Sequence, residues 1–511
     1  MEIEIMKTRY HPLTRSEIRL PLNHRGHRQA RIACLCATVI LRLMAPLAWA
    51  ETATVSVETR NPGAEISPDA LGLSYETSLL LPGTNGMHYF RSDNRPLVKM
   101  FRTLGVKSLR VGGNSVDAAR FPVPGEPDIR SLFKFARAAG VKVIYSVRLE
   151  DGDPQSAANI AKFIRKHYPG TLDCFAIGNE PKGYYKDTNV FLVKWTAIRD
   201  AILGVWPNAK FCGPDDNPSP EWCRMMVQRF GAPAGRLVEI TQHSYPLGCA
   251  YKNPKEKDVT RLVPVDARPA REKMLSPDDY ALYQKIYDGI KSSVAGTPVS
   301  FRLTEVNSYW FSGLAGASDR YASALWGVDY LRWWTAHGAD GLNFHTGDRS
   351  GGATVLPCRY AVFVTAANGY EIRPLGYGLK LFSLGGQGRT LPVNVSTGTN
   401  QNFVACANLS EKKTVFVTLI NKTHGAGVTN AEVQIKLDAP LSPGGARAVF
   451  LTSKTGDIAA DAAEVTLGGA PILRDGSWRG KWTAVPGVAG TNVVTLTMPP
   501  ASAAVVQLKV K

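Results

Sequence analysis

The stretch Cys174-Phe-Ala-Ile-Gly-Asn-Glu-Pro181 is a short apolar run that ends in an amide and a carboxylate. Such a run is typical of a buried strand, so its polar residues would lie at the strand's carboxyl end. Helical patterns, such as 128–139 and 319–331, separate it from similar runs. Seven further runs are Leu71–Tyr75, Ser108–Gly113, Lys142–Leu149, Lys210–Asp215, Glu239–Tyr245, Val299–Asn307 and Gly341–Gly347. Eight strand-and-helix units predict an α/β protein with a (β/α)8 TIM barrel.

The pattern changes after about residue 383, where short strands are separated by Gly, Pro, Asn and Asp. These strands are expected at Thr414–Ile420, Glu432–Leu437, Ala446–Leu451, Val493–Thr497 and Ala504–Leu508. They predict a C-terminal β-sandwich, into which the early run Ala53–Val57 is expected to pair back. The predicted organisation is a signal peptide (1–50), a strand joining the sandwich (51–69), the catalytic barrel (70–383) and the β-sandwich (384–511).

The N-terminal segment has the features of an export signal. Seven Lys and Arg residues precede the apolar run Ile32–Leu41, and Ala48-Trp-Ala50 provides the small residues that a signal peptidase recognises. The sequence therefore predicts a periplasmic or extracellular protein. No membrane span is expected, because no segment approaches about 20 uninterrupted apolar residues.

The composition excludes a disordered or collagen-like chain. Of 511 residues, 44% are hydrophobic and 20% are charged, which is enough apolar material for a core. The 60 Lys and Arg against 43 Asp and Glu give a net charge of +17, which favours anionic partners without choosing among them.

Six cysteines follow the export signal: Cys174, Cys212, Cys223, Cys249, Cys358 and Cys406. Buried thiols with one or two disulfides are expected in an oxidising compartment, and Cys212 and Cys223 are the closest pair in sequence. The sequence contains neither CxxC nor HExxH, so no metal site is expected, and no cofactor is predicted.

Two carboxylates are the candidate catalytic groups. Glu180 ends the fourth predicted barrel strand and Glu305 ends the seventh, at the rim where barrel enzymes carry their catalytic residues. Hydrolysis of a glycosidic bond needs a proton donor and a second carboxylate, and a spacing near 5 Å gives retention of configuration. The sequence therefore predicts Glu180 as acid/base and Glu305 as nucleophile.

Several segments together resemble the heparanase-like β-glucuronidases, glycoside hydrolase family seventy-nine of clan A. These are Asn179-Glu180-Pro181, Leu73–Glu76, Leu109–Asn114, Gln242–Pro246 and Thr304–Tyr309. The resemblance implies a secreted retaining endo-β-D-glucuronidase that acts on heparan sulfate or a related acidic polysaccharide. A monomer without nucleic-acid partners is expected.

The resemblance also implies roles for residues around the catalytic pair. Glu76 and Asn114 would meet sugar hydroxyls, Asn179 would bond the 2-hydroxyl, and Tyr245 would hold Glu305. The family binds the sugar carboxylate through backbone N–H groups after the nucleophile and through a tyrosine hydroxyl. Here these correspond to the segment Tyr309 to Gly313 and to Tyr360. His243 and His345 are expected to support the site rather than to act in the chemistry.

Two loops favour cleavage inside a chain. The loop Ala118–Pro127 is too short to wall off the cleft, and the segment Lys252–Lys273 carries seven bases against four acids. An exo-β-glucuronidase that acts on oligosaccharides or small glucuronides remains an alternative. Further alternatives are an arabinofuranosidase or xylosidase of the same clan, and a non-catalytic carbohydrate-binding protein.

Overall fold

The computed structural model describes residues 51–349, 356–398, 401–486 and 490–510 of the chain. The segment interpreted as a signal peptide, 1–50, lies outside the described residues. Within the described part, none of the helices is both long and apolar enough to cross a membrane.

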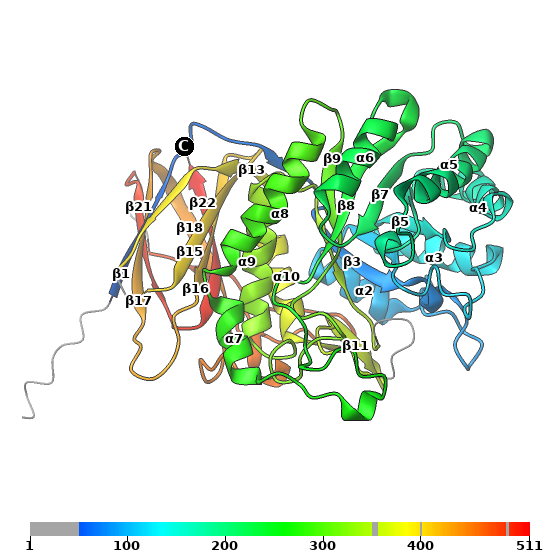
Figure 1. The fold of residues 1–511 in the computed structure, drawn as a ribbon. Helices are drawn as coiled ribbons and strands as arrows, with labels where there is room; N and C mark the ends of the chain where they lie inside the picture. Colours follow the sequence, from blue (N-terminus) through cyan, green and yellow to red (C-terminus); the bar gives the residue numbers. More distant parts are fainter. Residues whose placement is uncertain (1–50, 350–355, 399–400, 487–489, 511) are drawn as a thin grey trace, which may run out of the picture. The chain divides into compact units, whose positions relative to one another are not determined.

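Eight parallel strands close into a barrel in the order β10-β3-β4-β5-β6-β7-β8-β9 (Figure 1). Their bounds are β3 Leu71–Glu76, β4 Ser108–Gly112, β5 Lys142–Val147, β6 Leu172–Ile177, β7 Phe211–Asp216, β8 Leu237–Ser244, β9 Ser300–Val306 and β10 Leu342–His345. Each strand overlaps one predicted apolar run, so the predicted barrel is confirmed. Strands β3 and β4 are buried along their whole length, as expected where helices cover a parallel sheet.

Helices alternate with the barrel strands. They are α2 Arg95–Leu104, α3 Glu126–Ala139, α4 Pro154–His167, α5 Thr188–Val205, α6 Pro220–Phe230, α7 Ala267–Leu275, α8 Asp279–Val294, α9 Ala322–Ala336 and α10 Pro374–Gly385. Local sequence sets their ends. The Asp153 side chain accepts hydrogen bonds from the N–H groups of Gln155 and Ser156 and caps α4, and Gly105 ends α2 in the left-handed conformation.

The remaining strands form the predicted sandwich. One sheet has the order β14-β1-β17-β21 and the other β19-β18-β22-β16-β15-β13-β2, with β20 paired to β18. The early strand β1 pairs with β14 and with β17, and its Ala53, Val55 and Val57 belong to one buried cluster with residues of β16 and β22. The strands are β1 Glu51–Val57, β2 Glu65–Ile66, β13 Gly388–Leu391, β14 Val393–Ser396, β15 Phe403–Ser410, β16 Thr414–Asn421, β17 Ala431–Leu437, β18 Leu441–Ser453, β19 Val465–Leu467, β20 Thr483–Ala484, β21 Val493–Met498 and β22 Ser502–Val510. A separate hairpin, β11 Phe363–Ala366 and β12 Gly369–Ile372, lies between β10 and α10 in sequence.

The expected one or two disulfides do not form among the described cysteines, of which Cys174, Cys212, Cys223, Cys249 and Cys406 are free thiols. Cys212 and Cys223 are close in sequence but do not pair. Cys223 lies on α6, where its sulfur accepts a hydrogen bond from the Gln242 amide at 3.0 Å. The two thiols are close in sequence but belong to different elements, since Cys212 lies on strand β7 and Cys223 lies on helix α6.

Candidate active site

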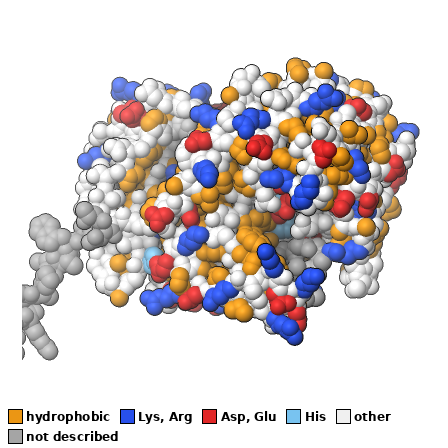
Figure 2. Space-filling view, in the orientation of Figure 1, with side chains coloured by type: hydrophobic (Ala, Val, Ile, Leu, Met, Phe, Trp, Pro, Cys, Tyr) orange, Lys and Arg blue, Asp and Glu red, His pale blue; other side chains and the backbone are white. Residues whose placement is uncertain are grey.

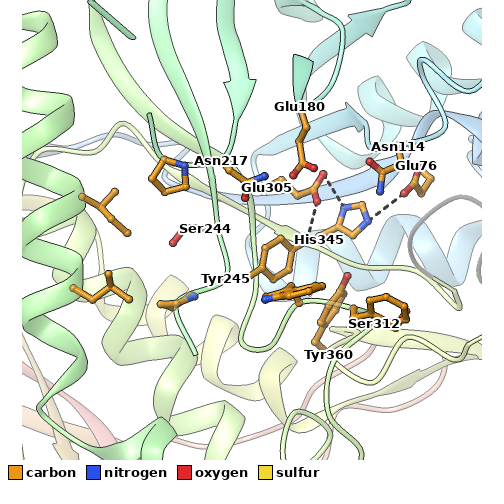
Figure 3. Close-up of a pocket in the computed structure, with 16 residues that line it drawn as sticks. Glu76, Asn114, Glu180, Asn217, Ser244, Tyr245, Glu305, Ser312, His345 and Tyr360 are labelled. Carbon is orange, nitrogen blue, oxygen red and sulfur yellow. Dashed lines mark hydrogen bonds and ion pairs between the residues drawn. The ribbon is translucent and has the colours of Figure 1, made fainter. Parts of the chain in front are cut away.

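A cavity of about 690 Å³ opens at the carboxyl ends of the barrel strands (Figure 3). This is the end of a TIM barrel at which catalytic residues are found. The described residues that line it are Glu76, Asn114, Glu180, Asn217, Pro218, Ser244, Tyr245, Pro246, Leu282, Ile286, Glu305, Trp310, Phe311, Ser312, His345 and Tyr360.

Glu180 directly follows β6 on a tight turn. Its φ of 47° lies in the left-handed region, which costs a non-glycine residue free energy and is found mainly at functional sites. The turn is held on both sides. The N–H of Glu180 donates to the carbonyl oxygen of Asp215 at 2.8 Å, and the N–H of Asn179 donates to the Asp117 carboxylate at 2.8 Å. The Glu180 side chain is 30% exposed, so its carboxyl group can reach both a ligand and water.

Glu305 is buried on β9 and both of its oxygens accept hydrogen bonds. Arg110 donates to Oε2 at 2.6 Å, and the Tyr245 hydroxyl donates to Oε1 at 2.8 Å. Its side chain is 10% exposed, and these two donors fix the direction in which the carboxylate points. This fixed orientation is what a nucleophile requires.

The two candidate carboxylates lie close together. Glu180, His243 and Glu305 each contribute one side-chain atom to a group within 4.8 Å of one another. The resulting separation of carboxylate oxygens matches the spacing of roughly 5–5.5 Å in retaining glycosidases, and is too short for the 6.5–9.5 Å of inverting ones. A metal ion is a poor alternative occupant, because the Arg110 cation and Tyr245 already use both oxygens of Glu305.

A histidine supports the acid/base candidate. Nδ1 of His243 lies 2.9 Å from Oε1 of Glu180, and Nε2 lies 3.5 Å from Oδ1 of Asp215. Burial opposes protonation of this ring, but the charges of Glu305 and Asp215 outweigh it and raise the pKa of His243 to about 10. The charged imidazolium therefore links two carboxylates and orients Glu180.

The electrostatic surroundings keep Glu305 ionised. Burial alone would raise its pKa. The positive charges of His345, His243 and Arg110 and the Tyr245 hydrogen bond lower the pKa of Glu305 to about 2. A carboxylate that must attack as an anion is therefore deprotonated at neutral pH.

Arg110 connects most of the site, although the sequence interpretation gave it no role. It is fully buried on β4, and its guanidinium donates to Glu305, to the Asn179 amide oxygen at 2.7 Å and to Asp215. Asp215 also accepts from the Thr304 hydroxyl, and nearby cations hold its pKa below the usual range despite burial. The signal available in the sequence was a base inside an otherwise apolar strand, which requires a buried anionic partner.

Glu76, Asn114 and His345 line one side of the cavity. Glu76 accepts hydrogen bonds from the N–H and hydroxyl of Ser115 at 2.8 and 2.6 Å, and Nε2 of His345 lies 3.7 Å from its other oxygen. The Asn114 amide oxygen accepts from Asn179 at 3.2 Å. Asn179 itself is only 4% exposed and is not among the residues that line the cavity. Glu76, Asn114 and His345 thus line the same cavity as Glu180 and Glu305.

The segment after the nucleophile has an unusual backbone. Phe311, Ser312 and Gly313 have successive φ values of 71°, 68° and 81°. Phe311 and Ser312 line the cavity, whereas the Tyr309 hydroxyl turns away and donates to the carbonyl oxygen of Ala270 at 3.0 Å.

Gly313 packs against the loop that carries Tyr360. A Cβ at Gly313 would lie 2.7 Å from the Tyr360 backbone nitrogen, so only glycine allows this approach. Tyr360 reaches the cavity, and its ring centroid lies 5.9 Å from that of Tyr245. The structure thus brings Ser312 and Tyr360 to the same cavity as Glu305.

No protein-family model matches the chain, and no curated protein matches its sequence. Solved structures of similar fold do match. A 4-O-α-L-rhamnosyl-β-D-glucuronidase from Fusarium oxysporum 12S is 18% identical, with a TM-score of 0.65 over 89% of this chain and 99% of that one. A GH51 arabinofuranosidase from Xanthomonas axonopodis pv. citri is 14% identical, with a TM-score of 0.63 over 90% of this chain and 100% of that one. The GH51 α-L-arabinofuranosidase from Thermotoga petrophila RKU-1 is 13% identical, with a TM-score of 0.64 and the same coverage. These similarities establish a shared barrel-and-sandwich fold.

Proposed function

We propose that the chain is a retaining glycoside hydrolase that cleaves β-glucuronides. The observation that carries the proposal is the pair of carboxylates within 4.8 Å, of which Glu305 is buried and held ionised and Glu180 is partly exposed. One group is suited to attack, and the other can exchange protons with a leaving group and with water.

The reaction proceeds by two displacements. In the first step an oxygen of Glu305 attacks the anomeric carbon, the bond to the leaving oxygen breaks, and Glu180 gives its proton to that oxygen. In the second step Glu180 takes a proton from water, the water oxygen attacks the same carbon, and the ester bond to Glu305 breaks. Tyr245 and Arg110 hold the Glu305 oxygens, and His243 holds Glu180 in position throughout.

A uronic acid is the proposed sugar next to the catalytic pair. Ser312, with its left-handed backbone, and Tyr360 line the cavity near Glu305, which supports carboxylate recognition as in family seventy-nine. His345 lies beside these residues, and Glu305 and Glu76 raise its pKa against the effect of burial, which favours its cationic form. The similarity in fold to a rhamnosyl-glucuronidase supports the same choice.

Cleavage inside heparan sulfate or a related acidic polysaccharide stays a prediction. It depends on the basic segment Lys252–Lys273. Several basic side chains of this segment make contacts within the protein. Lys273 donates to the carbonyl oxygen of Leu247 at 2.9 Å, Arg271 to that of Gly316 at 2.5 Å, and Arg261 pairs with Asp258 at 3.4 Å. On the face shown in Figure 2, Lys and Arg side chains are scattered among acidic and apolar ones. These contacts therefore favour the exo-β-glucuronidase alternative. Export and a monomeric state also stay predictions.

A panel of aryl glycosides tests the proposal. The β-glucuronide should be hydrolysed, whereas the β-glucoside, β-xyloside and α-arabinofuranoside should be poor substrates. Glu305→Gln serves as the control for contaminating activity. Preferred hydrolysis of the arabinofuranoside or xyloside would replace the glucuronidase with another glycosidase, and hydrolysis of none of them would leave a carbohydrate-binding protein.

A further inference from the structure

The cavity has an apolar region that the two-step reaction does not use. Pro218, Leu282 and Ile286 line this region in the same cavity as the catalytic pair. Leu282 is 39% exposed, so its side chain is open to a ligand in the cavity. Exposed apolar surface that continues into a catalytic cavity marks a region where a ligand is bound.

The packing of α8 explains how two of these residues reach the cavity. Gly289 and Ser293 lie against Pro220 at the start of α6. A Cβ at Gly289 would be 2.6 Å from the Pro220 ring, and the Ser293 hydroxyl donates to the Pro220 carbonyl at 3.2 Å. Residues 282, 286, 289 and 293 recur every three or four positions and so share one face of the helix. Leu282 and Ile286 lie on the same face of α8 as Gly289 and Ser293, and they line the cavity together with Asn217 and Pro218.

This apolar region lies on the leaving-group side of the catalytic pair. In Figure 3, Asn217 and Ser244 lie on one side of Glu180, and Asn114 and Glu76 lie on the other. The side with Asn114 and Glu76 holds the proposed uronic acid. The group that receives the proton of Glu180 must then extend toward Asn217, where α8 contributes its aliphatic side chains.

The charges of the cavity argue against an anionic group at this position. None of the described residues that line the cavity is Lys or Arg, and the lining residue next to Pro218 in sequence is the uncharged Asn217. A sulfate or carboxylate placed among Leu282, Ile286 and Pro218 would lose water without gaining a cation in return. A hydrophobic ring or alkyl chain would give up no hydrogen bonds to water and would bury apolar area.

We propose that the leaving-group subsite binds a hydrophobic aglycone, so that the preferred substrates are glucuronides of phenols or apolar alcohols. The inference rests on the proposed glucuronidase activity and specifies the substrate class of the same site. Water cleaves the glycosidic bond as above, and the products are free glucuronic acid and the neutral phenol or alcohol. Pro218 and the Leu282 and Ile286 side chains of α8 provide the apolar wall of this subsite.

The test compares methyl and hexyl β-D-glucuronides, whose leaving alkoxides have similar basicity but different apolar area. The hexyl compound should have a kcat/KM at least about tenfold higher, chiefly through a lower KM. In Leu282→Gln/Ile286→Gln the ratio of the hexyl to the methyl kcat/KM should fall to about twofold or less. Leu473→Gln, which changes an exposed leucine (47%) that does not line the cavity, should retain the full advantage.

A disaccharide of glucuronic acid linked to N-sulfoglucosamine is the competing probe. If it is hydrolysed with a higher kcat/KM than the hexyl compound, or if the double variant keeps the hexyl advantage, the hydrophobic subsite is overturned and the glucuronidase proposal stands. If none of the three glucuronides is hydrolysed, the proposed function itself fails. These outcomes therefore separate failure of the subsite from failure of the activity.

Discussion

Replacement of Arg110 by methionine should affect both the stability of the fold and the ionisation of the nucleophile. Arg110 is fully buried and donates to Glu305, Asn179 and Asp215. Methionine fills similar volume but leaves two buried carboxylates without this cation. Loss of one partner of a buried ion pair costs about 3–5 kcal/mol, and we expect the free energy of unfolding at pH 7 to fall by that amount.

The effect on Glu305 follows from its pKa. The folded-state value of about 2 lies below the ordinary value of 4.5, so ionisation of this group contributes about 3 kcal/mol of stability. That contribution is fully present above pH 4.5 and is lost as pH falls through about 2. A neighbouring arginine lowers a carboxyl pKa by about 1–3 units. In Arg110→Met, the apparent pKa of the acidic limb of the kcat/KM profile should therefore rise by about 1–3 units.

Urea unfolding at pH 7 and kcat/KM on an aryl β-glucuronide from pH 2.5 to 8 measure the two effects. Comparison of variant with wild type on one substrate cancels the titration of the substrate's own carboxylate. The control is Arg302→Met, which removes another buried arginine, paired with Glu239 at 3.2 Å and Asp69 at 2.9 Å. It should lower stability without moving the acidic limb. An Arg110→Met enzyme with an unchanged acidic limb would refute the assigned role of Arg110, and Arg110→Lys should recover part of the shift.

Three further predictions concern the catalytic pair, the sugar and salt. Glu305→Gln should lose nearly all turnover, and Glu180→Ala should hydrolyse only substrates with good leaving groups and gain rate with azide; an active Glu305→Gln would exclude this nucleophile. The wild type should hydrolyse an aryl glucuronide with a kcat/KM more than about a hundredfold above that on the matching glucoside, because the neutral sugar loses charge-assisted hydrogen bonds. Tyr360→Phe should reduce that ratio. Comparable wild-type rates on the two sugars would contradict this prediction. Since no described Lys or Arg lines the cavity, kcat/KM on a small aryl glucuronide should change less than about twofold when the Debye length is shortened from roughly 14 to 6 Å with added salt; a steep fall would indicate basic residues at the subsite, as a polyanion site requires.

The barrel could be predicted because each strand carries its own signal. Apolar runs such as Leu71–Tyr75 are buried on both faces of a parallel strand, and Gly, Pro and charged residues mark their ends. The sandwich strands were predicted from their short apolar runs and the Gly, Pro, Asn and Asp residues between them. The position of Glu180 and Glu305 at one rim follows directly, since parallel strands all end on the same side.

The interior of the site was less accessible to sequence interpretation. Arg110, Asp215 and His243 lie on three different strands, and only closure of the barrel shows that they form one network beneath the two glutamates. The apolar leaving-group side was missed for a similar reason. Leu282 and Ile286 resemble ordinary core positions of an amphipathic helix, and only the packing of α8 against Pro220 shows that they face a cavity.

The stereochemistry of hydrolysis tests the central assignment most directly. One oxygen of Glu180 and one of Glu305 lie within 4.8 Å, which matches the roughly 5–5.5 Å of retaining enzymes and is shorter than the roughly 6.5–9.5 Å that accommodates a water molecule in inverting ones. In a proton NMR time course with an aryl β-glucuronide, the β-anomer of glucuronic acid should therefore appear first, and the α-anomer should follow only through slow mutarotation. Initial formation of the α-anomer would contradict a double displacement at Glu305.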